Sequence, residues 1–199
     1  MTDNHLSFNE NISILVSDLM GKLCMINRVR HLLDQSTLLI VINCLVFSKL
    51  FYCSSVWSGP SKGNVAKLQL VQNFAARILS DKSKFDHITP TLKELNLLPI
   101  SDLLYLRDAT LTFKCMNGLV PPYLSTMFTL RSEVHNRSTR NCDKLQIPKC
   151  RTTLAQQAFY YRAVQIWNSL PKDITDLNSI KRFKHELKSR LTLSWKATV

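Results

Sequence analysis

The chain has 199 residues, 45% of them apolar, which is enough to bury a sizeable core and excludes a disordered chain. Only 4 glycines and 7 prolines interrupt it, so long helices are favoured over a glycine-punctuated β-meander. The formal net charge of +12 favours a polyanion or an acidic membrane surface as partner, against the alternative of a generic solubilising charge.

The positive charge is unevenly distributed along the chain. Residues 131–199 hold 14 Lys and Arg against 5 Asp and Glu, a net charge of +9, whereas residues 1–130 hold 12 against 9, a net charge of +3. We therefore expect the basic surface to be C-terminal.

The cysteines and the first residues bear on the compartment. Six cysteines have irregular spacings, and the first four lie in apolar helical patterns, which is typical of free thiols in a reducing compartment. The polar start Met1 to His5 lacks the features of a secretion signal. The most apolar stretch, Leu38 to Phe47, is shorter than the roughly 20 residues that span a bilayer. We expect an intracellular protein, in the nucleus or cytoplasm, with no membrane partner.

The N-terminal half of the chain predicts several helices. The capping-box spacing of Ser7 to Glu10 opens one helix that runs to about Arg30. Ser36 is the predicted N-cap of a second, Thr37 to about Trp57, which is apolar nearly all round and is therefore expected at the centre of the core. Its tail, Phe51 to Cys53, could equally be a strand.

Further helices follow the break at Gly59-Pro60-Ser61. Apolar residues at helical spacing predict a third helix over Val65 to Leu79. Thr89-Pro90 opens a short helix that ends near Asn96. Ser101 caps a longer one that stops at Asn117-Gly118.

Pro121-Pro122 cannot continue a helix and marks the predicted domain boundary. Beyond the polar loop 131–143, Lys144 to Ile147 alternates like a short strand, and helices are predicted from Thr153 to about Leu170 and over Ile180 to Leu191. The prediction is a mainly α chain with a helical domain at 1–118, a tether and basic loop at 119–143, and a basic C-terminal subdomain at 144–199 that could contain a short β element.

The sequence offers little for catalysis. Acidic residues are not clustered, and no glycine-rich phosphate loop is present. Asp173 and Asp176 precede the last helix, where a capping role is favoured. His135, Cys142 and Cys150, with His87 as a fourth group, would be the one zinc-like set, but the spacing fits no zinc motif and ordinary loop residues are favoured.

Cationic and aromatic side chains are interleaved near the C-terminus. Cations that can grip phosphates precede rings that can stack on bases. For the rings, the alternative that Tyr161 and Trp167 are core residues is favoured over base stacking. The residues of this stretch are Arg137, Arg140, Lys144, Lys149, Arg151, Phe159, Tyr160, Tyr161, Arg162 and Trp167.

Ordered motifs over nearly the entire chain resemble the region that follows the palm in reverse transcriptases of non-LTR retrotransposons of the jockey and chicken-repeat type. The motifs are Asp3 to Ile14, Tyr52-Cys53 with Val56-Trp57, Leu68-Gln69, Gln72-Asn73-Phe74-Ala75-Ala76-Arg77, Leu92 through Leu98-Pro99-Ile100, Phe113-Lys114-Cys115-Met116-Asn117-Gly118, Pro121-Pro122-Tyr123-Leu124, Arg137-Ser138-Thr139-Arg140, Pro148-Lys149-Cys150-Arg151-Thr152, Trp167-Asn168-Ser169-Leu170-Pro171 and Phe183-Lys184 with Leu187-Lys188.

The resemblance implies a thumb-like helical domain with a basic extension that holds template RNA and primer DNA beside the palm and fingers. The parent polymerase would use Mg²⁺ bound by paired palm aspartates, and no Asp-Asp occurs here, so we expect no polymerase activity, no cofactor and no small-molecule substrate for this chain. Candidate phosphate contacts lie in or beside the motifs: Arg77, Lys114, Arg137, Arg140, Lys149, Arg151 and Arg162.

Two alternatives to a nucleic-acid-binding fragment remain open. One is a structural or protein-interaction helical module whose exposed apolar patch packs on a missing polymerase palm. The other is an enzyme with a cryptic site, which would require carboxylates or a nucleophile to converge in a pocket.

Overall fold

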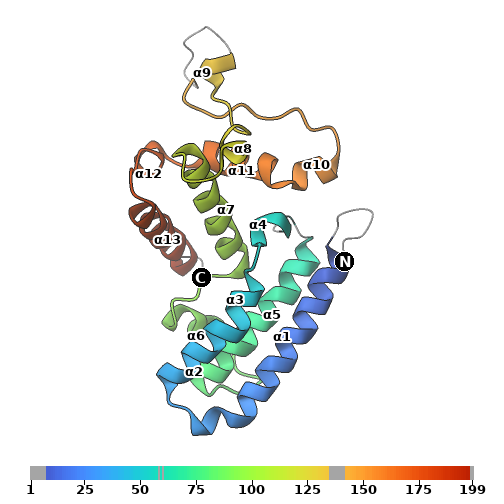
Figure 1. Cartoon of the computed structure of the whole chain (residues 1–199). Helices are drawn as coiled ribbons and strands as arrows, with labels where there is room; N and C mark the ends of the chain where they lie inside the picture. The colour runs from blue at the N-terminus through green and yellow to red at the C-terminus, as the bar shows by residue number, and fades with distance from the viewer. Residues whose placement is uncertain (1–7, 58, 60, 135–141, 198–199) are drawn as a thin grey trace. The chain divides into compact units, whose positions relative to one another are not determined.

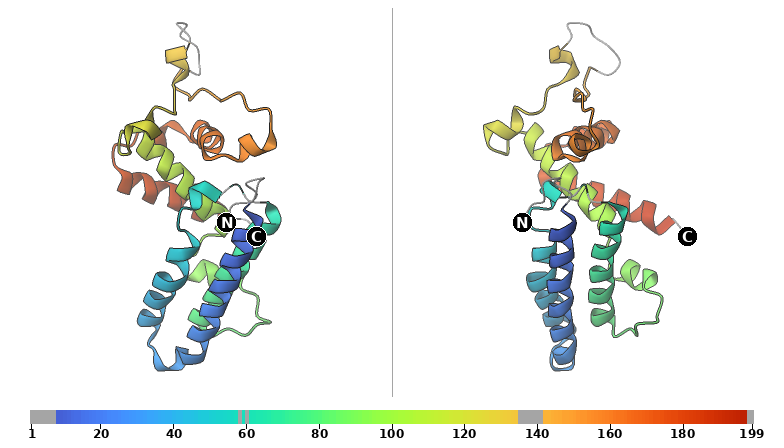
Figure 2. Two further views of the ribbon diagram at one scale, coloured as in Figure 1. Left: turned by 45° about the vertical axis from the view of Figure 1, so that its right-hand side comes forward. Right: turned by 90° about the vertical axis from the view of Figure 1, so that its right-hand side faces the viewer.

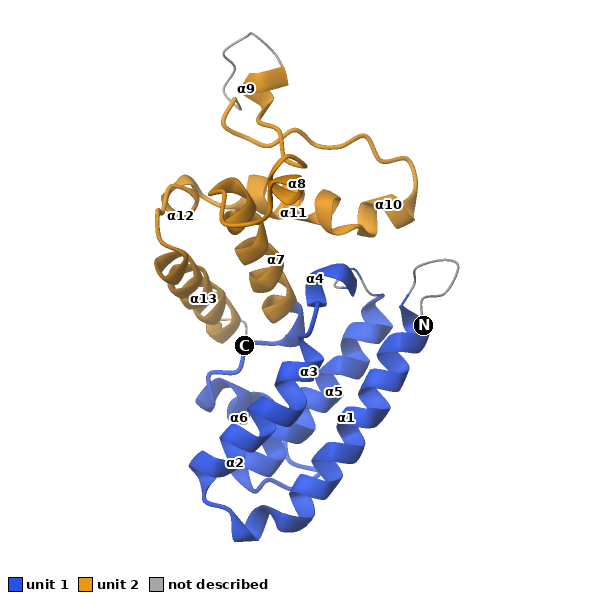
Figure 3. Ribbon diagram, viewed as in Figure 1, with its two compact units in different colours: residues 1–101 blue, residues 102–199 orange. Residues whose placement is uncertain are grey.

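The computed structural model describes residues 8–57, 59, 61–134 and 142–197. These residues are mainly helical, which confirms the predicted fold class. The chain divides into two compact units, residues 1–101 and 102–199 (Figure 3). The predicted capping residue Ser7 lies outside the described residues.

The described secondary structure of unit 1 is helical. Its elements in chain order are α1 (Asn9–Val29), a 3₁₀ turn (Arg30–Leu32), α2 (Gln35–Ile42), the π-helical segment η2 (Asn43–Phe47), α3 (Ser48–Leu50), α4 (Ser54–Trp57), α5 (Lys62–Ser80) and α6 (Thr89–Glu94), and Figure 1 labels the α-helices among them.

α1 and α5 form the centre of unit 1 and run side by side (Figures 1 and 2). Leu19 and Leu23 are fully buried on α1, and Leu68 and Val71 are fully buried on α5. These residues recur at the three- and four-residue spacing that places side chains on one helix face. The two predicted helices are therefore confirmed.

The prediction of one helix over Thr37–Trp57 is wrong in two respects: the N-cap is a different residue, and the helix is interrupted. Asp34, not Ser36, is the N-cap: one carboxylate oxygen accepts the backbone N–H of Ser36 and of Thr37, each at 3.1 Å. Hydrogen bonds from Ser36 and then Thr37 hold the pKa of Asp34 well below its usual range. The helix widens into η2 and stops after α3, where residues 51–53 form a turn instead of a strand.

The same segment is not the buried centre of the core. Leu38, Ile42 and Val46 face inward, but Ile40 is 61% exposed and Leu45 is 50% exposed. Helices α1 and α5 contact one side of α2–η2, and the described residues of unit 1 leave the other side in solvent. An apolar run alone does not reveal how many neighbours a helix will have.

Two glutamines fasten the end of unit 1 to α5. The side chain of Gln72, fully buried, donates to the carbonyl of Leu98 at 2.9 Å. Gln69 accepts the backbone N–H of Ile100 at 2.9 Å and donates to Gln72 at 2.7 Å. Backbone groups of a non-helical segment are thus satisfied inside the unit, as burial requires.

Unit 2 contains the remaining helices. They are α7 (Ile100–Met116, which starts at the boundary), α8 (Pro122–Ser125), α9 (Arg131–Val134), α10 (Thr153–Gln157), α11 (Phe159–Ser169), α12 (Lys172–Thr175) and α13 (Ile180–Ala197). The helix predicted from Thr153 is interrupted at Ala158, which has extended backbone and separates α10 from α11.

Three aromatic rings from α7, α11 and α13 make the core of unit 2. Phe113 stacks on Phe183 with ring centroids 4.4 Å apart, and Trp167 lies 6.4 Å from each. Because α7 contributes Phe113 and Ala109 to this core, the boundary between the units falls after Ser101 and not in the predicted tether at 119–143.

The predicted strand Lys144–Ile147 is reduced to an isolated antiparallel bridge between Leu130 and Leu145. The side chain of Asn168 accepts the N–H of Leu145 at 2.8 Å and donates to its carbonyl at 3.0 Å. Across the bridge, the N–H groups of Arg131 and Gln146 donate to the carbonyls of Lys144 and Thr129, each at 2.9 Å, and the pairing extends no further as a ladder, so no strand is found in the part of the chain that the structure describes.

We predict that Gln72→Ala will lower the free energy of unfolding by about 1–3 kcal/mol, because the carbonyl of Leu98 loses its partner inside the unit. Urea denaturation followed by circular dichroism measures the loss. Gln165→Ala on α11, an exposed glutamine in a helix, is the matched control. An equal effect of the two substitutions would contradict the fastening role of Gln72.

Candidate nucleic-acid interface

Unit 2 carries most of the positive charge. Its sequence holds 16 Lys and Arg against 7 Asp and Glu, a net charge of +9, whereas that of unit 1 holds 10 against 7, a net charge of +3. The predicted C-terminal excess thus coincides with one folded unit. The cations of unit 2 form the starting set for an anion-binding surface.

The seven predicted phosphate contacts are divided among different environments. Arg137 and Arg140 lie outside the described residues. Arg77 is on α5 of unit 1, and the other four, Lys114, Lys149, Arg151 and Arg162, are in unit 2.

Lys149 and Arg151 are the most accessible of the five predicted contacts that the structure describes. Both are exposed on the segment 146–151, which is not helical. Asn168 fixes the chain at Leu145 before this segment, and Thr152 fixes it afterwards as the N-cap of α10, where its hydroxyl accepts the N–H of Ala155 at 3.2 Å. The two cations therefore project from a short segment held at both ends.

Arg162 is engaged inside unit 2. Its Nε and one terminal nitrogen each lie 3.1 Å from the same carboxylate oxygen of Asp108, and a further nitrogen donates to the carbonyl of Gln157. The Asp108 side chain is 3% exposed and that of Arg162 is 16% exposed. Arg162 therefore already has a carboxylate partner inside unit 2. Its role as a phosphate contact stays a prediction.

Arg77 and Lys114 are half-buried. One terminal nitrogen of Arg77 donates to the carbonyl of Asp86 at 3.4 Å, and its Nε is buried with no hydrogen-bond partner among the described residues. Arg77 thus braces the loop after α5. The position of Lys114 on α7 leaves part of its side chain in solvent.

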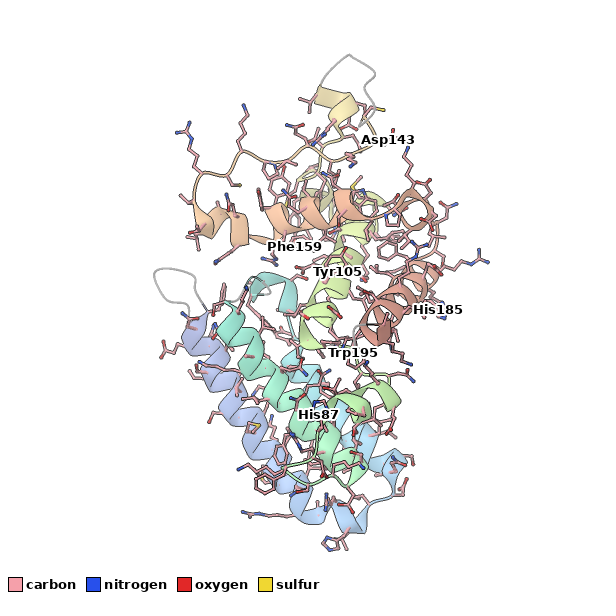
Figure 4. All side chains as sticks on the ribbon, turned by 180° about the vertical axis from the view of Figure 1, so that it is seen from behind. His87, Tyr105, Asp143, Phe159, His185 and Trp195 are labelled. Atoms are coloured by element: carbon pink, nitrogen blue, oxygen red, sulfur yellow. The ribbon has the colours of Figure 1, made fainter. Side chains whose placement is uncertain are left out.

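The aromatic residues near these cations pack mainly on one another. Phe159 and Tyr160 contact Phe128 edge-on, with centroids 6.3 and 5.5 Å apart. Trp167 is 8% exposed in the core, which confirms the favoured alternative for that ring, and Tyr161 is half-buried. Figure 4 marks Phe159 where α11 begins.

The helix α13 carries exposed cations that the sequence analysis did not place among the phosphate contacts. Lys181, Lys184 and Lys188 are all exposed. Their separations of three and four residues place them on one side of a helix. The spacing of these lysines, together with Phe183 and Leu187 on the buried side of the same helix, is the sequence signal that could have identified them as a cationic surface.

The zinc-like set does not assemble within the described structure. His135 lies outside the described residues, and among those that are described no group of three or more His, Cys, Asp or Glu side chains could hold a metal ion. The thiol of Cys142 instead donates to Asp143 at 3.2 Å, and Asp143 pairs with Lys172 at 2.6 Å. The hydrogen bond from Lys172 lowers the pKa of Asp143.

No helix in the described ranges is both long and apolar enough to cross a membrane. Comparisons with protein-family models, with curated proteins and with solved structures find no match for this chain.

We predict that Asp108→Ala will destabilise the protein by about 3 kcal/mol, because it leaves the guanidinium of Arg162 inside unit 2 without its carboxylate. Arg162→Ala should cost a similar amount, and the double variant should cost less than the sum of the two. Urea denaturation of the four proteins measures this coupling. Arg151→Ala, at an exposed position, should change the unfolding free energy by no more than about 0.5 kcal/mol.

Additive effects of the two substitutions would show that the ion pair contributes nothing to stability. In that case Arg162 would be available as a phosphate contact.

Proposed function

We propose that this chain binds nucleic acid as a non-catalytic part of the reverse transcriptase of a non-LTR retrotransposon. The observation that carries the proposal is the net charge of +9 on unit 2, together with the exposed pair Lys149 and Arg151. Cations held on a folded unit neutralise phosphates and release counterions, which makes binding favourable and dependent on salt.

The order of the sequence motifs supports this origin. In the fold, several of the motif residues have structural partners: Gln69 and Gln72 hold Leu98 to Ile100, and Asn168 holds Leu145. The cations Lys149 and Arg151 belong to one of the same motifs, and their side chains extend into solvent. A fold in which side-chain amides hold the backbone, and from which cations extend into solvent, suits a thumb-like domain that binds template and primer.

The proposed role is to bind nucleic acid and not to synthesise DNA. The polymerases that the chain resembles coordinate magnesium with adjacent aspartates, and the sequence contains no Asp-Asp pair. The copying reaction would then belong to the palm and fingers, with which this chain would be associated.

We predict micromolar binding of the chain to RNA, to DNA and to their hybrid, with an affinity that falls steeply as salt rises from about 50 to 200 mM. Lys149→Gln with Arg151→Gln should reduce the slope of log K against log salt by about 1.5, because two phosphate contacts are lost. Filter binding over the salt series measures the slope. The variant that carries Lys62→Gln and Lys84→Gln removes two exposed charges from unit 1 and is the matched control.

Absent or salt-insensitive binding by the unaltered chain would defeat the proposed function. Equal slopes for the two variants would retain nucleic-acid binding but remove Lys149 and Arg151 from the contact.

A second candidate function, a helical protein-interaction module, is favoured by the exposed apolar face of unit 1. Leu39, Ile40 and Leu45 of α2 and η2 are 42%, 61% and 50% exposed, and Leu32 before α2 is 72% exposed. Apolar side chains gathered on one face often mark a protein-binding surface. In this version the face packs on the polymerase palm.

If that candidate is right, the isolated chain should self-associate at micromolar concentration, because these apolar side chains are exposed in the described structure. Ile40→Ser with Leu45→Ser should shift sedimentation velocity profiles towards monomer. Leu119→Ser with Leu154→Ser, at exposed positions of unit 2, is the control that should not. A monomeric unaltered chain would argue against this candidate.

A further inference from the structure

The exposed side of α13 carries a row of lysines. Lys181, Lys184 and Lys188 are exposed, whereas Phe183 and Leu187 on the other side are 0% and 3% exposed in the core of unit 2. With a rise of 1.5 Å per residue, the three ammonium groups are distributed over about 10 Å of helix. The core thus fixes which side of α13 faces solvent, and that side is cationic.

The acidic groups near this row have partners of their own. Glu186 accepts from Nε of Arg190 at 3.2 Å, and Asp173 accepts from a terminal nitrogen of the same guanidinium. The hydrogen bonds to Asp173 and Glu186 raise the pKa of Arg190. No ion pair between described residues uses Lys181, Lys184 or Lys188. Both carboxylates are therefore paired with Arg190, whereas the three lysines have no such partner among the described residues.

A groove adjoins the first of the three lysines. Its volume is about 510 Å³, and its lining combines Lys181, Arg182 and His185 with the carboxylates of Asp173 and Glu186 and the apolar side chain of Leu177. Figure 4 labels His185 on α13. A volume of this size lies within the range of sites that accept small ligands. Because Lys181 belongs to both, the groove adjoins the row of lysines, and the two carboxylates in its lining are the ones that pair with Arg190.

The chemistry of this surface favours nucleic acid over a lipid bilayer. A helix that binds a membrane interface buries its apolar side among the acyl chains, but the apolar side of α13 is already buried against Phe113 and Trp167. Lysines act as point charges that contact phosphates without reading bases. A linear row of them matches a backbone that carries one negative charge per nucleotide.

We propose that the exposed side of α13, with Lys181, Lys184 and Lys188 and the adjoining Arg182, is a sequence-independent contact for the phosphate backbone of nucleic acid. The inference rests on the proposed function and adds to it a second contact surface, which lies on a helix apart from Lys149 and Arg151.

Replacing the three lysines by glutamine in the full chain tests this contact. Three lost contacts to a single strand should lower the slope of log K against log salt by about 2 and the affinity by about 100-fold at 0.1 M salt. Adding Arg182→Gln should lower the slope by a further 0.7, approximately one contact. Fluorescence anisotropy with labelled RNA and DNA strands of two unrelated sequences measures both quantities.

The matched control replaces Lys62, Lys82 and Lys84 of unit 1 by glutamine, which removes the same formal charge from exposed positions. Its slope should remain close to that of the unaltered chain. Circular dichroism should show that both triple variants keep their helical content, because none of the six side chains is in a core.

The possible outcomes separate the two proposals. If the unaltered chain binds but both triple variants give the same slope, the α13 contact is wrong and the proposed function stands. If the unaltered chain does not bind at all, the proposed function fails. A preference of more than about tenfold between the two sequences would overturn sequence independence, since point charges on phosphates do not discriminate bases.

Vesicles of phosphatidylserine provide the last comparison. If the α13 variant loses vesicle binding while nucleic-acid binding is unchanged, an acidic membrane surface is the partner and the inference is overturned. Loss of nucleic-acid binding, with vesicle binding weak in every protein, supports it.

Discussion

The paired hydrogen bonds between Asn168 and Leu145 are the constraint on which unit 2 depends. Leu145 is fully buried, so its N–H and carbonyl must be satisfied, and one amide side chain satisfies both at 2.8 and 3.0 Å. Asn168 follows Trp167, whose ring lies in the aromatic core, so the core and the loop are fixed by adjacent residues. The segment that presents Lys149 and Arg151 begins one residue beyond Leu145 and inherits its position.

Unit 1 uses the same solution with glutamines. Gln69 and Gln72 lie three residues apart on α5 and reach the backbone of Ile100 and Leu98. In both units an amide side chain bonds to the backbone of a chain segment whose backbone groups have no helical partner. The motifs on which the resemblance to retrotransposon polymerases depends therefore contain residues with definite structural tasks, whatever the nucleic-acid contacts prove to be.

Periodicity predicted the helices α1, α5, α7 and α13 because it records which side of each is apolar. It could not predict what covers that side, so the α2–η2 segment was expected in the centre of the core and instead exposes Ile40 and Leu45. The predicted strand at Lys144 is reduced to a single bridge with Leu130, and the N–H and carbonyl of Leu145 bond to a side chain 23 residues away, which local alternation does not reveal. The domain boundary was misplaced because Phe113 belongs by sequence to the N-terminal pattern and by packing to the second core.

Long-range partners also decide which cations are available to a ligand. In sequence, Arg162 and Arg151 look alike, yet Arg162 meets an aspartate 54 residues away and Arg151 meets solvent. Arg190 likewise pairs with Asp173 and Glu186, so that the carboxylate of Glu186 on α13 already has a cationic partner. The net charge of unit 2 is therefore a poor guide to any single residue, because the paired cations stabilise the fold. Lys181, Lys184 and Lys188, which form no ion pair with a described residue, and the exposed pair Lys149 and Arg151 are left to act on an anion.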